Sequence, residues 1–89
     1  MNADDRWSIE VFVADIDGET DAEARLTKAD YRNFTGRGKA KLNPADRNVA
    51  VIGEEIAVAR ALSDLSHKLL HSAAVGVESM THEKARLYR

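Results

Sequence analysis

The sequence contains no cysteine, a single proline and only five aromatic residues. Without cysteine there is neither a disulfide framework nor a thiolate metal site, so the composition does not require an oxidising compartment. No apolar run approaches the roughly 20 residues of a membrane-spanning helix, and the N-terminus lacks the basic patch and apolar run of a secretory signal. We therefore expect a soluble, cytoplasmic protein.

The chain is short enough to limit its own core. Eighty-nine residues without an internal repeat or a low-complexity tract fit one small domain spanning residues 1–89. A chain of this size buries only about two thirds of its surface on folding. Association with a second copy would add to that thin core.

Charge is divided unevenly along the chain although its net value is only −2. Residues 1–23 carry eight acids and one base, a net of −7, whereas residues 24–47 carry seven bases and two acids, a net of +5. The division fits a basic patch for an anionic partner. It fits equally well adjacent strands that neutralise each other across a sheet.

Alternation of apolar and polar residues predicts three strands in the first half of the chain. The stretch "WSIEVFVADID" places Trp7, Ile9, Val11 and Val13 on one face, which we expect to be buried. Polar stretches separate it from "AEARLTKAD" at 22–30 and from "FTGRGKAKLN" at 34–43, both of which also alternate. The prediction is a three-stranded antiparallel meander.

The third of these strands carries Gly36 and Gly38 on its inward parity. Glycines there allow a covering helix to approach closely, or mark a bulge. The same residues form a "GRG" sequence found in RNA-binding segments, but a single copy is a weak signal, and we prefer the packing role.

Helical periodicity dominates after Pro44. Apolar residues from Val49 to His71 recur at helical spacing and predict a long amphipathic helix. The following "SAAVGVESMTHEKARLYR" contains Gly76 and is predicted to form a short second helix or a tail. Together with the meander, this predicts an α+β fold.

No catalytic constellation or cofactor motif is present. Cysteine is absent, no serine lies in an elbow or triad context, and "GRGKAK" lacks the spacing of phosphate-binding loops, so we expect a protein that is not an enzyme and holds no cofactor. Asp64, His67 and His71 share one helical face at metal-ligand spacing. With Lys68 beside them, a solvated helix flank is the better interpretation, and we predict no metal site.

A resemblance enters through the segment "AKLNPADRNVAVIGEEIAVARALSDL" at 40–65 and the shorter "THEKARL" at 81–87. These stretches resemble a family of small, uncharacterised actinobacterial proteins whose mycobacterial members belong to the hypoxia and dormancy response. The resemblance implies a fold like that of the double-stranded-RNA-binding domain, a homodimer, and similarity to ribosome hibernation-promoting factors. It supplies no catalytic residues.

Two functional hypotheses follow. The first is a stress protein that binds the ribosome or structured RNA through a basic sheet face, without a stacking aromatic among the bases. Its hypothesised RNA contacts are Arg25, Lys28, Arg32, Arg37, Lys39 and Lys41. Such binding would weaken by roughly one power of salt concentration for each phosphate neutralised.

The second hypothesis is a dimeric protein-interaction or regulatory module with no nucleic-acid partner. In it, Glu10 and Glu23 neutralise the basic face, so a bond from either to a base of that face would favour this hypothesis. The expected dimer interface is Leu65, Leu69, Val75, Val77 and Tyr88. Neither hypothesis includes a membrane or a small-molecule substrate.

Overall fold

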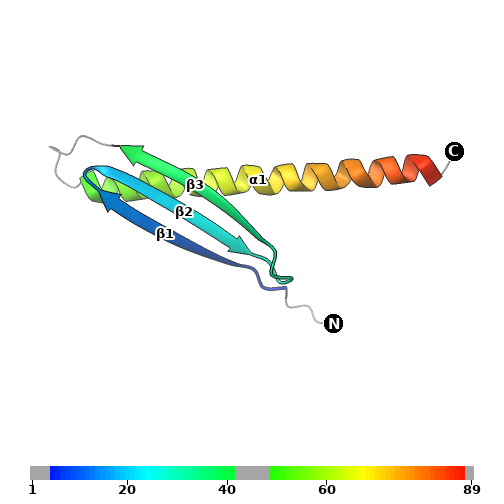
Figure 1. Cartoon of the computed structure of the whole chain (residues 1–89), viewed down its shortest axis with the longest axis horizontal. Coiled ribbons are helices and arrows are strands. Elements are labelled where there is room, and N and C mark those ends of the chain that lie inside the picture. Colours follow the sequence, from blue (N-terminus) through cyan, green and yellow to red (C-terminus); the bar gives the residue numbers. More distant parts are fainter. Residues whose placement is uncertain (1–4, 42–48, 88–89) are drawn as a thin grey trace.

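The fold is a three-stranded antiparallel sheet followed by one long helix (Figure 1). The computed structural model describes residues 5–41 and 49–87, with side chains for 5–41 and 51–81. The elements are β1 (Ser8–Ile16), β2 (Glu19–Thr27), β3 (Asn33–Lys41) and α1 (Val49–Leu87). The strand order β1-β2-β3 is the predicted meander, so the α+β fold is confirmed.

A two-residue turn joins β1 to β2. Asp17 and Gly18 both have positive φ, 52° and 76°. This left-handed pair matches the right-handed twist of the two strands, and Asp-Gly is one of the sequences that adopt it most readily. The turn sets the register in which Phe12 lies opposite Glu23.

The helix packs against β2 and β3 at very close range. Gly36 and Gly38 face α1, where a Cβ added to Gly36 would lie within 3.0 Å of the carbonyl of Ala61 and the amide of Leu65. A Cβ on Gly38 would meet the backbone of Ala57 and Ala61 in the same way. The two alanines are fully buried. The close-approach role expected for these glycines is therefore correct.

The intrachain core lies between α1 and the inner face of β2 and β3, and it is small. Its buried apolar members are Ala22, Ala24, Leu26, Ala40, Ala57, Ala61 and Leu65. Thr20 is the buried polar residue, and its hydroxyl donates to Asp15 Oδ1 at 2.8 Å. Most of these side chains are small because the helix and the strands approach so closely.

The expected burial of β1 is wrong for the single chain. Val11 lies opposite Ala24 and therefore points to the helix side of the sheet, as the alternation predicted. However, α1 runs over β3 and β2 and contacts β1 only marginally. Every residue of β1 is exposed, including Trp7 before it at 47% and Ile9 at 52%. The physical reason is that one helix cannot cover three strands.

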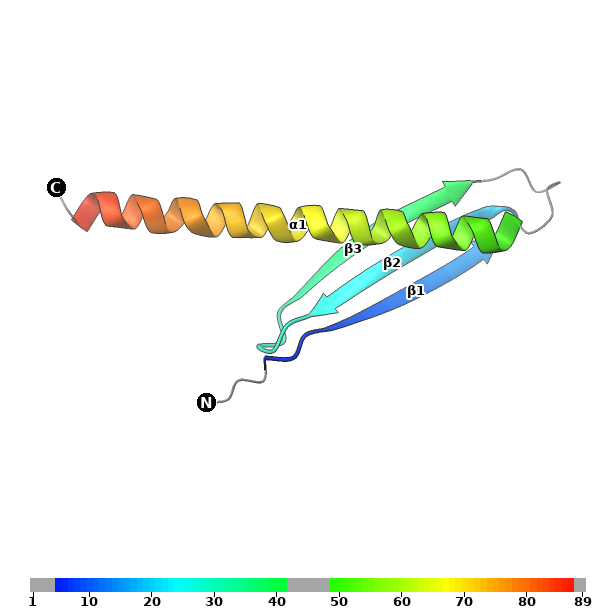
Figure 2. The same ribbon diagram turned by 180° about the vertical axis from the view of Figure 1, so that it is seen from behind.

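Residues 73–87 are helical, which is one of the two alternatives expected for this segment, but they continue α1 instead of forming a separate helix. Gly76 lies within the helix, and residues 71–81 are exposed on all sides. Figure 2 shows this part of α1 extending well beyond the sheet; we call residues 71–81 the helix overhang. No helix in the described residues combines the length and the apolar content needed to cross a membrane.

Candidate interaction surfaces

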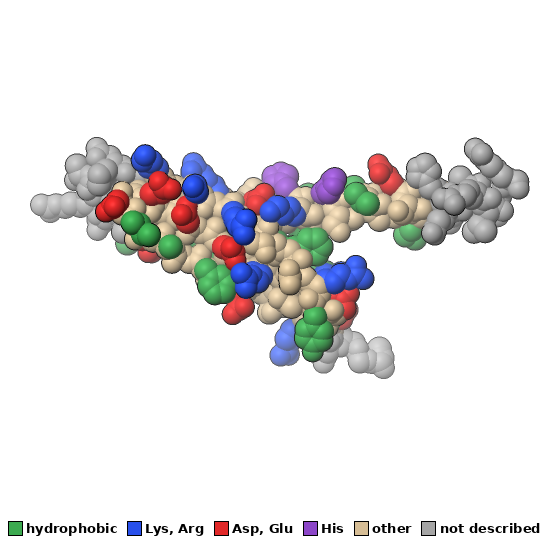
Figure 3. Space-filling view, in the orientation of Figure 1, with side chains coloured by type: hydrophobic (Ala, Val, Ile, Leu, Met, Phe, Trp, Pro, Cys, Tyr) green, Lys and Arg blue, Asp and Glu red, His purple; other side chains and the backbone are tan. Residues whose placement is uncertain are grey.

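The outer face of the sheet, opposite α1, carries both signs of charge in equal number. Its acids are Glu10, Glu19, Asp21 and Glu23, and its bases are Arg25, Arg37, Lys39 and Lys41. Four of each give a formal charge of zero. Acidic and basic side chains intermingle across the strands in Figure 3.

Glu23 links the bases of β2 and β3. Arg25 Nη2 lies 2.6 Å from Glu23 Oε2, and Arg37 Nε lies 3.5 Å from Glu23 Oε1. The hydrogen bond from Arg25 is the main cause that lowers the pKa of Glu23, with a smaller contribution from Arg37. The carboxylate therefore stays ionised and holds both guanidinium groups along the sheet.

The other four hypothesised RNA contacts lie either on the outer face of the sheet or in the connection between β2 and β3. Lys39 Nζ lies 3.5 Å from Glu19 and 3.9 Å from Asp21, so it too is paired. Arg32 lies in the β2–β3 connection and pairs with Asp30 at 3.1 Å. The remaining two are Lys28, whose ammonium lies over the Trp7 ring, and Lys41 at the end of β3. The six bases are therefore spread over the face and one loop.

An aromatic side chain beside the bases of this outer face was not anticipated from the sequence. Phe12 points outward, is 48% exposed, and has the Arg25 guanidinium 5.3 Å from its ring centre. It borders an open hollow of about 370 Å³ together with Glu23, Arg37 and Lys39. The alternation of β1 placed Phe12 on this side, but only the strand order shows that the bases of β2 and β3 lie beside it.

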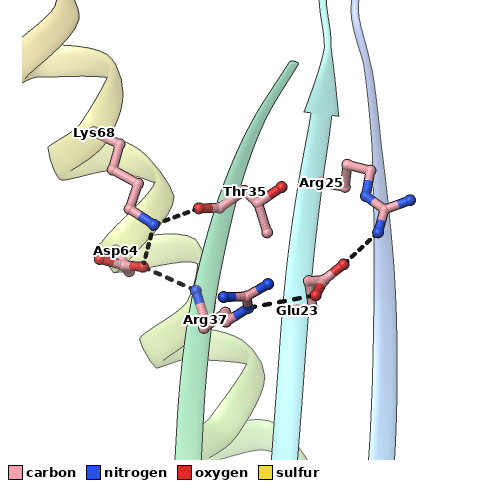
Figure 4. Close-up of polar contacts among 6 residues, drawn as sticks. All are labelled: Glu23, Arg25, Thr35, Arg37, Asp64 and Lys68. Atoms are coloured by element: carbon pink, nitrogen blue, oxygen red, sulfur yellow. Dashed lines mark hydrogen bonds and ion pairs between the residues drawn. The ribbon is translucent and has the colours of Figure 1, made fainter.

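Side chains of α1 cover the free edge of β3 (Figure 4). The backbone N–H of Arg37 donates to Asp64 Oδ2 at 2.9 Å, and Lys68 Nζ donates to the carbonyl of Thr35 at 2.6 Å. Arg60 Nη1 donates to the carbonyl of Lys39, also at 2.6 Å. The three helix residues are four positions apart, so they follow the strand along its edge.

A groove between β1 and α1 is lined mostly by apolar side chains, with Glu54, Glu55 and Ser66 among them. One hollow of about 380 Å³ lies between Ile9 and the helix residues Leu62 and Leu69. A second, of about 430 Å³, lies between Val13, Val58 and Leu62. Because Leu62 lines both, they form one continuous surface, which we call the β1–α1 groove.

The expected dimer-interface residues fall into different environments. Leu65 is 3% exposed and belongs to the intrachain core, so it offers no free surface. Leu69 is partly buried at the groove, while Val75 and Val77 are exposed on the helix overhang. Tyr88 lies outside the described residues. The groove was missed at the sequence level because β1 was expected to be covered by its own helix.

Two of the three residues considered as metal ligands, Asp64 and His67, are bonded to other groups of the protein. Asp64 accepts from Arg37 and pairs with Lys68 at 3.3 Å, and His67 Nδ1 lies 2.8 Å from the carbonyl of Ser63. Within the described part of the chain, no group of three His, Asp or Glu residues is arranged to hold a metal ion.

Comparison with known proteins identifies the family. The Rv2632c-like family model matches residues 5–86, which include all three strands and nearly all of α1. The chain belongs to the Rv2632c-like family. The match confirms the part of the resemblance that placed this chain in a family of small uncharacterised proteins with mycobacterial members.

Mycobacterial relatives of this Rv2632c-like protein align along most of its chain. The uncharacterized protein MT1780 of Mycobacterium tuberculosis (strain CDC 1551 / Oshkosh) is 44% identical over 81 residues, 91% of this chain and 85% of the relative. The uncharacterized protein Rv2632c of strain ATCC 25618 / H37Rv is 45% identical over 75 residues, 84% of this chain and 80% of its own. The crystal structure of Rv2632c superposes with a TM-score of 0.80 at 42% identity, covering 91% of this chain and 95% of that one.

Proposed function

We propose that this member of the Rv2632c-like family is a self-associating interaction module, in which a second copy of the chain covers the apolar β1–α1 groove. One observation carries the proposal: Ile9, Val11 and Val13 point to the helix side of the sheet yet remain 40–52% exposed beside Leu62. Fully burying an aliphatic side chain contributes about 1.5–3 kcal/mol. Covering this surface would therefore add substantially to a core made mostly of alanines.

The bonds of Glu23 support this proposal over the nucleic-acid hypothesis. Glu23 contacts both Arg25 and Arg37, and the outer face has no net charge. A neutral face attracts a phosphate polymer weakly, because such binding depends on unneutralised bases. The helix overhang adds support, since most helical stability in proteins comes from packing, and residues 71–81 have none in the single chain.

Sedimentation equilibrium and light scattering at micromolar concentration would test the proposal. We expect a dimer for the native chain and a monomer for Leu62→Glu, which places a charge in the groove. Ser63→Glu is the matched control because Ser63 is the next residue of α1 and is exposed outside the groove. A native monomer, or equal dissociation by both variants, would contradict self-association through the groove.

A second candidate is contact with the ribosome or structured RNA, as in the proposed similarity to ribosome hibernation-promoting factors and the dormancy response. The observation in its favour is Phe12, an exposed aromatic with Arg25 stacked on it and Arg37 nearby. Aromatic and guanidinium planes are the surfaces on which unpaired bases stack. The fold likeness to the double-stranded-RNA-binding domain belongs to this candidate as well.

Co-sedimentation with ribosomes at low salt would test the second candidate. Replacing Arg37, Lys39 and Lys41 by glutamine should abolish co-sedimentation, because phosphate contacts depend on these charges. Replacing Phe12 by serine should weaken it without changing its salt dependence, since stacking involves no counterion release. Unchanged co-sedimentation of the triple variant would count against RNA contact by this face.

A further inference from the structure

The two edges of the sheet differ in how their backbone groups are occupied. On β3, the N–H of Arg37 and the carbonyls of Thr35 and Lys39 point away from the sheet and are bonded by α1. On β1, the opposite edge, every residue is exposed. Among the described residues, no side chain or loop bonds to its outward backbone groups. One edge is closed and the other is open.

The backbone groups that point to the open side can be identified from the register. Neighbouring residues of a strand direct their N–H and C=O groups to opposite sides. Because Arg37 points outward on β3, Gly36 points to its partner Ala24 on β2. Glu23, the neighbour of Ala24, then points to Phe12 on β1. The residues of β1 with unpaired backbone groups are therefore Ile9, Val11, Val13 and Asp15.

We propose that β1 pairs edge to edge with β1 of a second copy, in an antiparallel two-fold arrangement centred on Phe12, forming one six-stranded sheet. This inference rests on the proposed self-association and specifies how it occurs. Pairing centred on Phe12 places Val11 opposite Val13 and Ile9 opposite Asp15 of the other copy. All four residues with unpaired backbone groups are then bonded in each chain.

Charge and length favour this register over the others. The apolar side chains of both copies stay on the helix side only if the two-fold axis passes beside a residue paired with its own copy. A slip by one residue would move the apolar side chains of one copy to the outer face. Centring on Glu10 or Asp15 would oppose two like charges. Centring on Val11 or Val13 would pair only seven of the nine residues of β1. The Phe12 register pairs all nine and places Glu10 opposite Ala14.

The same arrangement continues the apolar surface of the groove. Ile9, Val11 and Val13 of the two copies would form one apolar floor on the helix side, flanked by Leu62 of each α1. On the outer face the two Phe12 rings would meet, and aromatic cross-strand pairs stabilise sheets. Edge pairing therefore brings the exposed apolar side chains on both faces of β1 beside those of the other copy.

The closed edge of β3 limits assembly to two copies. An open edge on both sides of a sheet permits head-to-tail addition and leads to fibres. Because Thr35, Arg37 and Lys39 each bond to α1 through one outward backbone group and side chains of α1 cover this edge, β1 of another copy has only β1 to pair with. The pair uses both open edges and is complete.

Disulfide trapping is the direct test, because the native chain contains no cysteine. The backbone groups of Phe12 point to β2, so its pair across the two-fold axis would not be hydrogen-bonded, with Cα atoms about 4.5 Å apart. That spacing accepts a disulfide. We expect Phe12→Cys in the full chain to convert to a covalent dimer under mild oxidation, seen by non-reducing electrophoresis and mass spectrometry.

Glu10→Cys and Ala14→Cys are the matched controls on the same strand and the same face. Each alone should stay uncrosslinked, because two copies of residue 10 would lie about 13 Å apart along the strands. When the two variants are reduced, mixed and then oxidised, they should form a disulfide between residue 10 of one copy and residue 14 of the other (the 10-to-14 disulfide), because these residues lie opposite each other. The mixture also keeps the test decisive if Phe12→Cys does not fold.

The outcomes separate the two proposals. A monomeric native chain would overturn self-association and edge pairing together. A native dimer that forms neither the 12-to-12 nor the 10-to-14 disulfide would overturn edge pairing and leave self-association through the groove intact. Cross-linking of Glu10→Cys to itself, faster than Phe12→Cys, would overturn the Phe12 register.

Discussion

The backbone N–H of Arg37 on β3 donates to Asp64 Oδ2 on α1, at 2.9 Å. This bond joins the helix to an edge strand through a side chain and a backbone group 27 residues apart in sequence. Together with Lys68 and Arg60, Asp64 occupies backbone groups that would otherwise accept another strand. It also gives the helix a fixed position along β3.

We expect Asp64→Asn to destabilise the fold at neutral pH. The bond from the Arg37 amide, followed by Lys68, lowers the pKa of Asp64 below its ordinary value of 3.8. A carboxylate whose pKa is lowered on folding stabilises the protein above its ordinary pKa, and that stabilisation is lost as the pH falls through the folded pKa. Urea unfolding at several pH values would measure the difference between the native chain and the variant, which should shrink below pH 3.8.

Glu78→Gln serves as the control for that measurement, because Glu78 is an exposed carboxylate on the same helix, outside the groove, with no ion pair to a described side chain. It should change stability little at any pH. A constant difference between the native chain and Asp64→Asn down to low pH would show that the bond to Arg37 does not depend on the charge.

The Arg37 amide should exchange with solvent slowly for an edge position. Amides bonded in the native state exchange only when that bond opens. In Asp64→Ala, hydrogen exchange followed by NMR should accelerate at Arg37 while the amide of Gly38, bonded within the sheet, keeps its rate. Equal rates at Arg37 in both proteins would mean that Asp64 does not protect this edge.

Gly36→Ala and Gly38→Ala should each destabilise the fold strongly, by about 1–3 kcal/mol or more. The added Cβ would meet helix backbone that can move only if α1 shifts away from β3. Gly76→Ala is the matched control, because an added Cβ there meets nothing within 4 Å. Alanine is favoured over glycine in a helix by about 1 kcal/mol, so this variant should be stabilised. Thermal unfolding of the three variants would compare them.

Glu23→Gln should convert the outer face from neutral to basic. Removing one of the four acids leaves the four bases with a net of +1 and releases Arg25 and Arg37 from their shared partner. Retention on heparin should therefore increase and become more sensitive to salt. Glu54→Gln, the same charge change on α1, is the control. Equal retention of the two variants would mean that Glu23 does not mask the face.

The elements of this fold follow closely from local sequence patterns. Alternation identified the strands, helical spacing identified α1, and the inward parity of Gly36 and Gly38 indicated close packing beneath a helix. Gly76 was less informative, since a glycine in an otherwise helical segment costs only about 1 kcal/mol and did not end α1. Periodicity reports the direction of a side chain, and these features depend only on direction.

The surfaces were harder to predict because they depend on which elements become neighbours. Alternation alone places Phe12 on the outer side of β1, but its position beside Arg25 follows from the strand order and register. Leu65 and Leu62 have the same apolar character, and only the path of α1 over β2 and β3 buries the first and leaves the second exposed. Neither distinction is present in a linear pattern.

The amino-acid sequence by itself determined the three strands, the long helix, and which side chains of each strand share a face, because these depend on alternation and spacing along the chain. Only the tertiary structure decided that α1 covers β2 and β3 but not β1, that Asp64 closes one sheet edge, and that Glu23 neutralises the bases around it. The physical reason is that coverage, edge occupation and charge pairing are properties of distances between segments far apart in sequence.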